Sequence, residues 1–176
     1  MTNLPAPILW SMATVTAIAA ITDLHSRIIP NWLVATGMAL GFGLNTYLFG
    51  WAGLQAAALG FGLALALYIP LFLLRAMGGG DVKLMAAVGS LAGPQDWFTI
   101  FVFASVLGAV FALALLFFRN SAGAAFQNIW HILKNLARFR APYASNPDLD
   151  ISSPKAITMP HGVAIAAGTL AFLFLR

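Results

Sequence analysis

The stretch LALALYIPLFLLRAMGGGDVKLMAAVGSLAG, residues 63–93, contains two apolar runs separated by three glycines and an aspartate. A helix that crosses the hydrocarbon core of a bilayer needs about 20 mainly apolar residues. The run before the glycines begins at residue 54 and is long enough, whereas the run 82–92 extends only roughly 16 Å at the helical rise per residue. The stretch therefore predicts two membrane helices joined by a glycine-rich, acidic turn.

The composition of the whole chain also indicates a membrane protein. Of its 176 residues, 61% are hydrophobic and 8% are charged, whereas soluble domains carry about 25% charged residues. We expect an all-α polytopic membrane protein with a single domain, residues 1–176, and about six transmembrane helices. The predicted spans are 6–22, 32–49, 54–74, 82–92, 97–118 and 159–175.

A long polar segment, residues 119–158, separates the last two predicted spans. Apolar residues recur within it at helical spacing: Phe126, Ile129, Trp130, Leu133, Leu136 and Ala137. This pattern predicts an amphipathic helix on the cytoplasmic membrane surface. The prolines and small polar residues that follow it, around Asp148 and Asp150, predict a solvated loop.

The basic residues predict the orientation in the membrane. If all six segments cross, eight of the nine lysines and arginines fall on one side, and only Arg176 falls on the other. By the positive-inside rule, the first side is cytoplasmic and both termini are periplasmic. A fourth segment that re-entered without crossing would reverse the later part of the chain, which the same rule disfavours. The basic residues are scattered singly, which argues against nucleic-acid binding.

Tryptophans lie close to several predicted span ends: Trp10, Trp32, Trp51 and Trp97. Tryptophan is enriched where a membrane helix meets the aqueous interface. We therefore expect all four to belong to an aromatic belt.

The acidic residues are few, and two of them stand out by position. The chain has no glutamate, and Asp96, Asp148 and Asp150 are assigned to the opposite side or to the polar loop. Asp23 ends the first span and Asp81 opens the fourth, so the two crossings between them return the chain to the same face. An acid at the membrane edge is costly and suggests function. The alternative is that Asp23 marks a helix end and Asp81 caps the next helix.

Two carboxyl groups that meet at this depth have a defined chemistry. Groups a few Å apart share one proton near neutral pH. One can then act as general base on a water while the other polarises a carbonyl. This predicts aspartyl proteolysis by Asp23 and Asp81 without a cofactor. The chain has no cysteine, and its three histidines are dispersed, so no metal site is predicted.

Residues around Asp81 are candidates for binding the substrate. Gly78, Gly79 and Gly80 lack a Cβ, which permits positive φ and a close approach by another backbone. A peptide could lie against them as an extended strand, although a hinge between helices explains the same glycines. Lys83 and Arg27 could contact the substrate, or they could only anchor the topology.

Three motifs resemble those of one family. The segment 78–84, GGGDVKL, is similar to the GxGDxK pattern of type IV prepilin peptidases, which are membrane aspartyl proteases. The segment 23–33, DLHSRIIPNWL, resembles the first motif of that family, an aspartate followed by a basic residue and Ile-Pro-Asn. The segment 159–168, MPHGVAIAAG, resembles the entry to the last helix, with His161 where an aromatic residue is usual.

This resemblance implies a specific activity. It implies that Asp23 and Asp81 are the catalytic pair and that the substrate is a prepilin or pseudopilin with a short basic leader before an apolar helix. Cleavage is then expected at the cytoplasmic face of the bacterial inner membrane, in a short form of the Flp-pilus type. Larger members also carry a methyltransferase region, often with a cysteine-based zinc site. We do not expect N-methylation by this chain.

Two other functions remain compatible with the sequence. A small transporter would also contain broken helices and membrane-edge acids, but it predicts charges at the bilayer midplane and internal symmetry. A non-catalytic assembly factor for a pilus or secretion machine would tolerate the replacement of Asp81 by asparagine, whereas a peptidase would not.

Overall fold

The computed structural model describes residues 4–75, 77–118, 130, 135 and 160–175. The helices in this part of the chain are α1 (Ala6–Ser26), α2 (Asn31–Leu73), α3 (Gly79–Phe118) and α6 (His161–Leu175). The stretches Ala6–Ser26, Asn31–Leu73 and Gly79–Leu115 are long and apolar enough to cross a membrane, and α6 is a shorter apolar helix. The described residues therefore form a helical bundle of the composition expected for a membrane protein.

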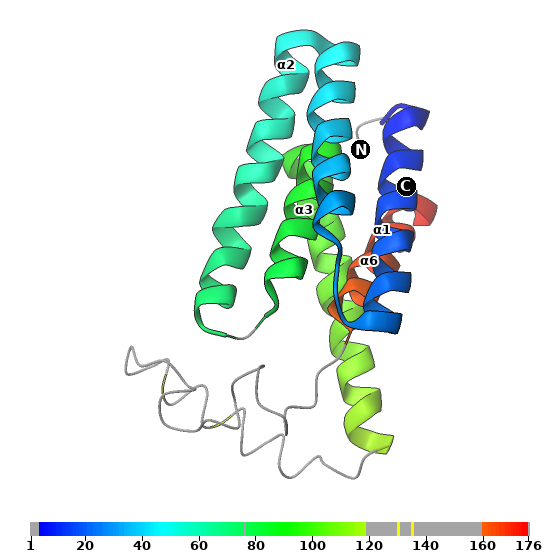
Figure 1. Ribbon diagram of the computed structural model, residues 1–176, viewed down its shortest axis with the longest axis vertical. Helices are drawn as coiled ribbons and strands as arrows, with labels where there is room; N and C mark the ends of the chain where they lie inside the picture. Colours follow the sequence, from blue (N-terminus) through cyan, green and yellow to red (C-terminus); the bar gives the residue numbers. More distant parts are fainter. Residues whose placement is uncertain (1–3, 76, 119–129, 131–134, 136–159, 176) are drawn as a thin grey trace.

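Each of the two longest helices consists of two arms that meet at a glycine. The backbone leaves helical geometry at Gly50 (φ 60°, ψ −139°) in α2 and at Gly93 (φ 73°, ψ 173°) in α3. Positive φ values of this kind favour glycine because it has no Cβ. Figure 1 shows that the two arms of each helix run antiparallel. The breaks fall at the sequence turns that separate the predicted spans 32–49 from 54–74 and 82–92 from 97–118.

Helix ends differ from the predictions by a few residues because helical hydrogen bonds continue past the first charged side chain. Helix α1 continues to Ser26 rather than residue 22, which places Asp23 inside its last turn. It ends at Arg27, whose φ is 56° and whose N–H donates to the Asp23 carbonyl oxygen at 3.0 Å. A left-handed residue at this position is a common helix stop. Helix α3 begins at Gly79 rather than residue 82, and so includes the last two glycines of the run.

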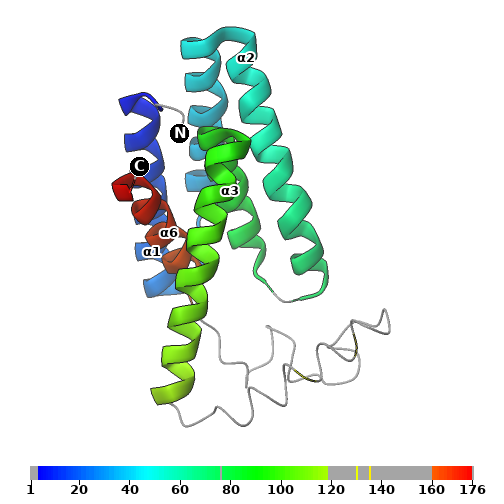
Figure 2. The same ribbon diagram turned by 180° about the vertical axis from the view of Figure 1, so that it is seen from behind.

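The first arm of α3 is the centre of the bundle. Its side chains from Leu84 to Val88 are buried, and α3 contacts α1, α2 and α6. Figures 1 and 2 show α3 between α2 on one side and α1 with α6 on the other. The arm that presents Asp81 is therefore packed between α2 on one side and α1 with α6 on the other.

Small residues bring this central arm close to α2. A Cβ on Gly60 would collide with the Gly89 carbonyl oxygen and would lie 2.9 Å from the Gly93 carbonyl carbon. Asn45 adds hydrogen bonds from its Nδ2 to the carbonyl oxygens of Ser90 and Leu91, at 3.0 and 3.2 Å. Small residues and interhelical hydrogen bonds are the usual means by which membrane helices associate.

The prediction of an aromatic belt is wrong for one of the four tryptophans. Trp10, Trp32 and Trp51 are exposed, but Trp97 is 0% exposed. Its indole Nε1 donates to the Met85 carbonyl oxygen at 3.0 Å. The turn at Gly93 folds the second arm of α3 back along the bundle, which carries Trp97 into the core rather than to the interface.

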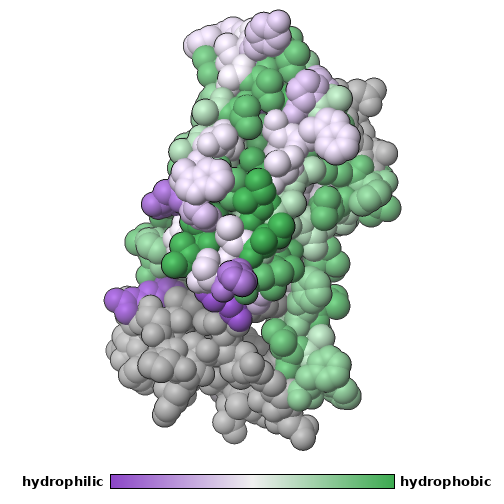
Figure 3. Space-filling view, turned by 45° about the vertical axis from the view of Figure 1, so that its right-hand side comes forward, coloured by the Kyte–Doolittle hydropathy of each residue, from purple (hydrophilic) through white to green (hydrophobic). Residues whose placement is uncertain are grey.

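The outer surface of the helices is largely apolar. Exposed large hydrophobic residues occur on every helix, for example Ile21, Leu59, Phe98 and Phe174. Figure 3 shows apolar side chains over much of the visible face, with the most hydrophilic coloured residues mainly in its lower half. Such a surface suits contact with lipid. The predicted surface helix and loop, residues 119–158, lie outside the described residues apart from Trp130 and Asn135.

Candidate functional site

The two predicted catalytic carboxyl groups lie at one end of the bundle. Asp23 is in the last turn of α1 and Asp81 is in the first turn of α3. The end of α1 and the starts of α3 and α6 lie at a similar height in the lower half of Figure 1. The side chains of Asp23 and Asp81 are close enough for their charges to interact. The fold thus brings together two acids that are far apart in the sequence.

Asp23 is held by the beginning of the last helix. Its side chain is 7% exposed, and its Oδ2 accepts a hydrogen bond from the Gly162 backbone N–H at 2.8 Å. An acid near a helix C-terminus faces the negative end of the helix dipole, which is unfavourable. The first N–H groups of another helix have no partner within that helix and carry partial positive charge. The start of α6 therefore stabilises Asp23 where its own helix does not.

Space at this contact is tight for any side chain at position 162. A Cβ there would lie 3.0 Å from both the Cβ and the Oδ2 of Asp23, which is closer than two such atoms normally approach. Gly162 belongs to the MPHG segment, whose resemblance concerns only the entry to the last helix. Nothing in the sequence indicates that Asp23 is its partner.

Asp81 caps the helix on which it lies. Its carboxyl group accepts a hydrogen bond from the backbone N–H of Gly78, immediately before α3 begins. An acidic side chain at the third helical residue that bonds back to the N-cap N–H is half of a capping box. Asp81 therefore has the helix-capping role that the sequence allows as an alternative to catalysis. The same hydrogen bond fixes its carboxyl group at this end of the bundle. Asp81 remains partly exposed.

The glycine run differs from the expectation of positive φ. Among the described glycines, positive φ occurs at Gly50 and Gly93, whereas Gly79 and Gly80 form the first turn of α3. The close neighbour of Gly79 is a side chain rather than another backbone, because a Cβ on Gly79 would lie 3.3 Å from the Phe72 ring. A Cβ on Gly78 would lie 3.2 Å from Asp81 Oδ2.

The two N-terminal sequence motifs contact each other directly. Lys83 is exposed, and its Nζ donates to Asn31 Oδ1 at 3.0 Å. A Cβ on Gly80 would lie 3.3 Å from the Cβ of Ile29, which is itself buried. The loop that follows Asp23 is therefore fastened to the turn that carries Asp81. Arg27 is exposed at the end of α1, at the same end of the bundle.

The other acids do not join this pair. Asp96 follows the turn at Gly93, where it is 8% exposed, at the far end of the first arm of α3 from Asp81. Asp148 and Asp150 lie outside the described residues. In the part of the chain that the structure describes, no group of three His, Cys, Asp or Glu side chains could hold a metal ion.

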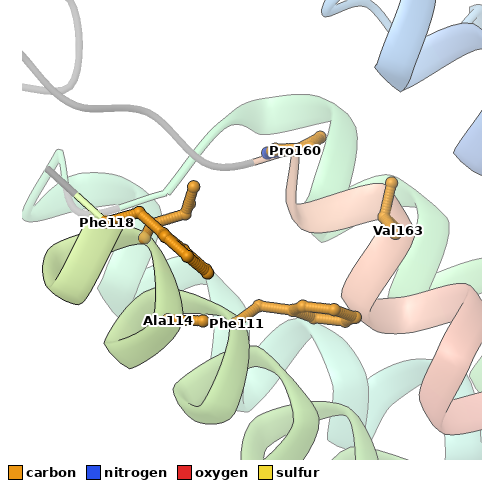
Figure 4. A pocket seen from close by; sticks show the side chains of 6 residues that line it. Phe111, Ala114, Phe118, Pro160 and Val163 are labelled. Carbon is orange, nitrogen blue, oxygen red and sulfur yellow. The ribbon is translucent and has the colours of Figure 1, made fainter.

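An apolar cavity of about 270 Å³ lies between α3 and the start of α6. Figure 4 shows Phe111, Ala114 and Phe118 on α3 facing Pro160 and Val163, and Leu115 completes the lining. None of these side chains can donate or accept a proton. This cavity therefore offers no group for acid–base chemistry, whereas Asp23 and Asp81 are the described carboxylic acids at this end of the bundle.

A family model for the type IV leader peptidase family matches residues 10–113. The match covers more than half of the chain and includes Asp23, the glycine run and Asp81. The chain belongs to the type IV leader peptidase family. This leader peptidase family match extends from α1 into the second arm of α3, and therefore contains the first arm of α3, which is the centre of the bundle.

A curated relative supports the same family. The "Prepilin leader peptidase/N-methyltransferase" of Bacillus subtilis (strain 168) is 36% identical over 100 residues. The aligned part is 55% of this leader peptidase family member and 40% of the relative, so the alignment spans well under half of that protein. No solved structure matches the chain.

Proposed function

We propose that this chain is a membrane aspartyl endopeptidase that removes the short basic leader from type IV prepilins or pseudopilins. The observation that carries the proposal is the meeting of Asp23 and Asp81 at one end of an apolar helical bundle. Membership of the leader peptidase family supplies the reaction class, and the relative's name supplies the substrate class.

The proposed reaction is hydrolysis of one peptide bond by the aspartate pair. The ionised carboxylate takes a proton from water, and the water oxygen attacks the scissile carbonyl carbon. The protonated carboxyl group donates a hydrogen bond to the carbonyl oxygen as it gains charge. When the tetrahedral intermediate collapses, the C–N bond breaks and the leaving nitrogen takes a proton from the pair. One water is consumed, and the pair again shares one proton.

The residues around the pair have proposed roles in binding. Gly78, Gly79 and Gly80 are proposed to contact the substrate backbone beside Asp81. Lys83 and Arg27 are proposed to contact the substrate near its cleavage site. The bond from Lys83 to Asn31 supports an additional role for Lys83, that of holding the two motifs together.

The proposed setting is the bacterial inner membrane with the site at the cytoplasmic face. Six crossings are supported by α1, the two antiparallel arms of α2 and of α3, and α6. Arg27, Arg75 and Lys83 lie close in sequence to the ends that carry Asp23 and Asp81, which favours a cytoplasmic position for this end. Both termini are then periplasmic.

Cleavage of a prepilin by the purified protein tests the proposal. The substrate is a Flp-type prepilin with its basic leader and apolar helix, supplied in lipid nanodiscs with the chain. Mass spectrometry is expected to show one new N-terminus at the end of the leader, at a rate proportional to the amount of protein. The absence of cleavage across all pilin-like proteins of the source cell would contradict the proposal and favour an assembly factor.

Replacing Gly162 with alanine is expected to slow this cleavage roughly 10- to 100-fold, because misplacement of a catalytic group by as little as 1 Å has effects of that size. The new methyl group would displace Asp23 from its present position. The rate is measured at matched protein levels against Gly43→Ala, since a Cβ on Gly43 meets nothing within 4 Å. Equal rates for the two variants would show that the contact with Gly162 does not position Asp23.

A further inference from the structure

Tyr68 is a buried tyrosine close to Asp81. The reaction proposed above assigns it no role. It lies near the end of α2, and its side chain is 4% exposed. A buried hydroxyl normally has a hydrogen-bond partner, because an unsatisfied one costs free energy. The question is which polar group Tyr68 faces.

The ring of Tyr68 is fixed by two aromatic neighbours. Its centroid lies 6.3 Å from that of Trp97 and 5.9 Å from that of Phe101, both in edge-to-face geometry. Trp97 and Phe101 stack on each other with centroids 5.6 Å apart. These contacts hold the ring in one place but offer its hydroxyl no strong acceptor.

The register between α2 and α3 places Tyr68 beside the turn that carries Asp81. The second arm of α2 runs antiparallel to the first arm of α3, with Gly60 against Gly89 and Phe72 against Gly79. Tyr68 lies one helical turn before Phe72, and residues four apart share a helix face. Tyr68 therefore lies between these two contacts, close to the level of Asp81.

Two further contacts agree with this register. Trp97, which packs on Tyr68, donates to the carbonyl oxygen of Met85, one turn after Asp81. Tyr68 and Asp81 are close enough to interact electrostatically. Asp81 has acceptor capacity left, because the Gly78 N–H uses one of about four lone-pair positions on a carboxylate.

We propose that Tyr68 is a positioning residue: its hydroxyl faces the Asp81 carboxyl group and donates a hydrogen bond to it during the reaction, which holds the carboxyl group toward the reacting water. The inference rests on the proposed function for its kinetic consequence, but not for the contact itself. Gly78 on one side and Tyr68 on the other then confine Asp81 to one orientation during the reaction.

Removing only the hydroxyl tests the kinetic part. Tyr68→Phe is expected to lower kcat for prepilin cleavage about 10- to 100-fold, the range expected for a hydrogen bond to a charged group, with little change in KM. Tyr47→Phe is the matched control, because Tyr47 is 86% exposed, and it is expected to leave both constants unchanged. Tyr68→Leu removes the ring as well. Full activity of Tyr68→Phe with loss in Tyr68→Leu would assign Tyr68 to packing alone and overturn the proposal.

Infrared spectroscopy tests the contact without any substrate. The carboxyl stretching band of Asp81 is identified in a pH titration of the protein in nanodiscs as the band that Asp81→Asn removes. Tyr68→Phe is expected to shift this band, and Tyr47→Phe is not. If Tyr68→Phe fails to accumulate, 3-fluorotyrosine at position 68 keeps the ring and strengthens the donor, and the band is again expected to shift.

The two readouts separate failure of this inference from failure of the proposed function. An inactive wild type whose Asp81 band shifts in Tyr68→Phe supports the contact and contradicts the peptidase. An active wild type with an unshifted band and an unchanged kcat in Tyr68→Phe overturns the inference and leaves the peptidase intact.

Discussion

Replacing Asp23 or Asp81 with asparagine is expected to abolish leader cleavage, with a loss of at least about 10³-fold for either single variant. Proton transfer by a positioned side chain contributes about 10²- to 10⁴-fold, and an amide can neither take the proton from water nor share one with the remaining aspartate. The double variant is expected to be no slower than the single ones, because residues that act as a unit are not additive.

Asp96→Asn is the control for this experiment. Asp96 is also buried, at 8% exposure, but it lies at the far end of the first arm of α3. The Asp96→Asn variant is expected to leave the rate of cleavage unchanged when the amounts of protein in the membrane are matched. Cleavage by both Asp23→Asn and Asp81→Asn at the wild-type rate would contradict the assignment of the pair. Loss of cleavage in only one of them would show that the other aspartate has the structural role of a helix-end residue.

Replacing Gly60 with alanine is expected to destabilise the bundle, whereas alanine at Gly43 or Gly62 of the same helix is not. The added Cβ would collide with the Gly89 carbonyl oxygen, and backbone atoms cannot rotate away as a side chain can. Overpacking of this kind costs about 1–3 kcal/mol and occasionally more. Separation of the arms would also displace the helix that carries Asp81.

The measurement for Gly60→Ala is the thermal unfolding midpoint in detergent, together with the amount of protein in the membrane. Gly62→Ala is the matched control two residues away, since a Cβ there meets nothing within 4 Å. Gly62→Ala is expected to equal or exceed the wild type, because alanine is the better helix former. Equal midpoints for the two variants would show that the arms are not held in close contact at Gly60.

The helical segments of the described chain were predictable from hydropathy alone. The apolar runs end at the short stretches 50–53 and 93–96, which predicted both turns. Gly50 and Gly93 in these stretches adopt positive φ, which glycine does without strain. Helix ends were less predictable: Asp23 was expected to follow α1 but lies in its last turn. Charged side chains do not stop a helix whose backbone hydrogen bonds can continue.

Contacts between distant segments were not predictable from the sequence. Trp97 was expected at the membrane interface because its position in the chain, next to a turn, says nothing about the direction in which the turn leads. Gly162 and Tyr68 gave no signal of their proximity to Asp23 and Asp81. Their importance depends on which helices are neighbours and in which register, and a single sequence does not record either.

The hydrogen bond between Gly162 and Asp23 joins residues 139 positions apart, and this separation has a consequence for synthesis. Ribosomes add about 5–20 residues per second, so Asp23 is made on the order of ten seconds before its partner. In the later part of that interval, once Asp81 has been made, the nascent chain contains both aspartates but lacks the helix start that stabilises one of them. Hydrolytic competence is therefore expected to be acquired only when the last helix is inserted, so that chains interrupted before it are harmless to neighbouring peptides.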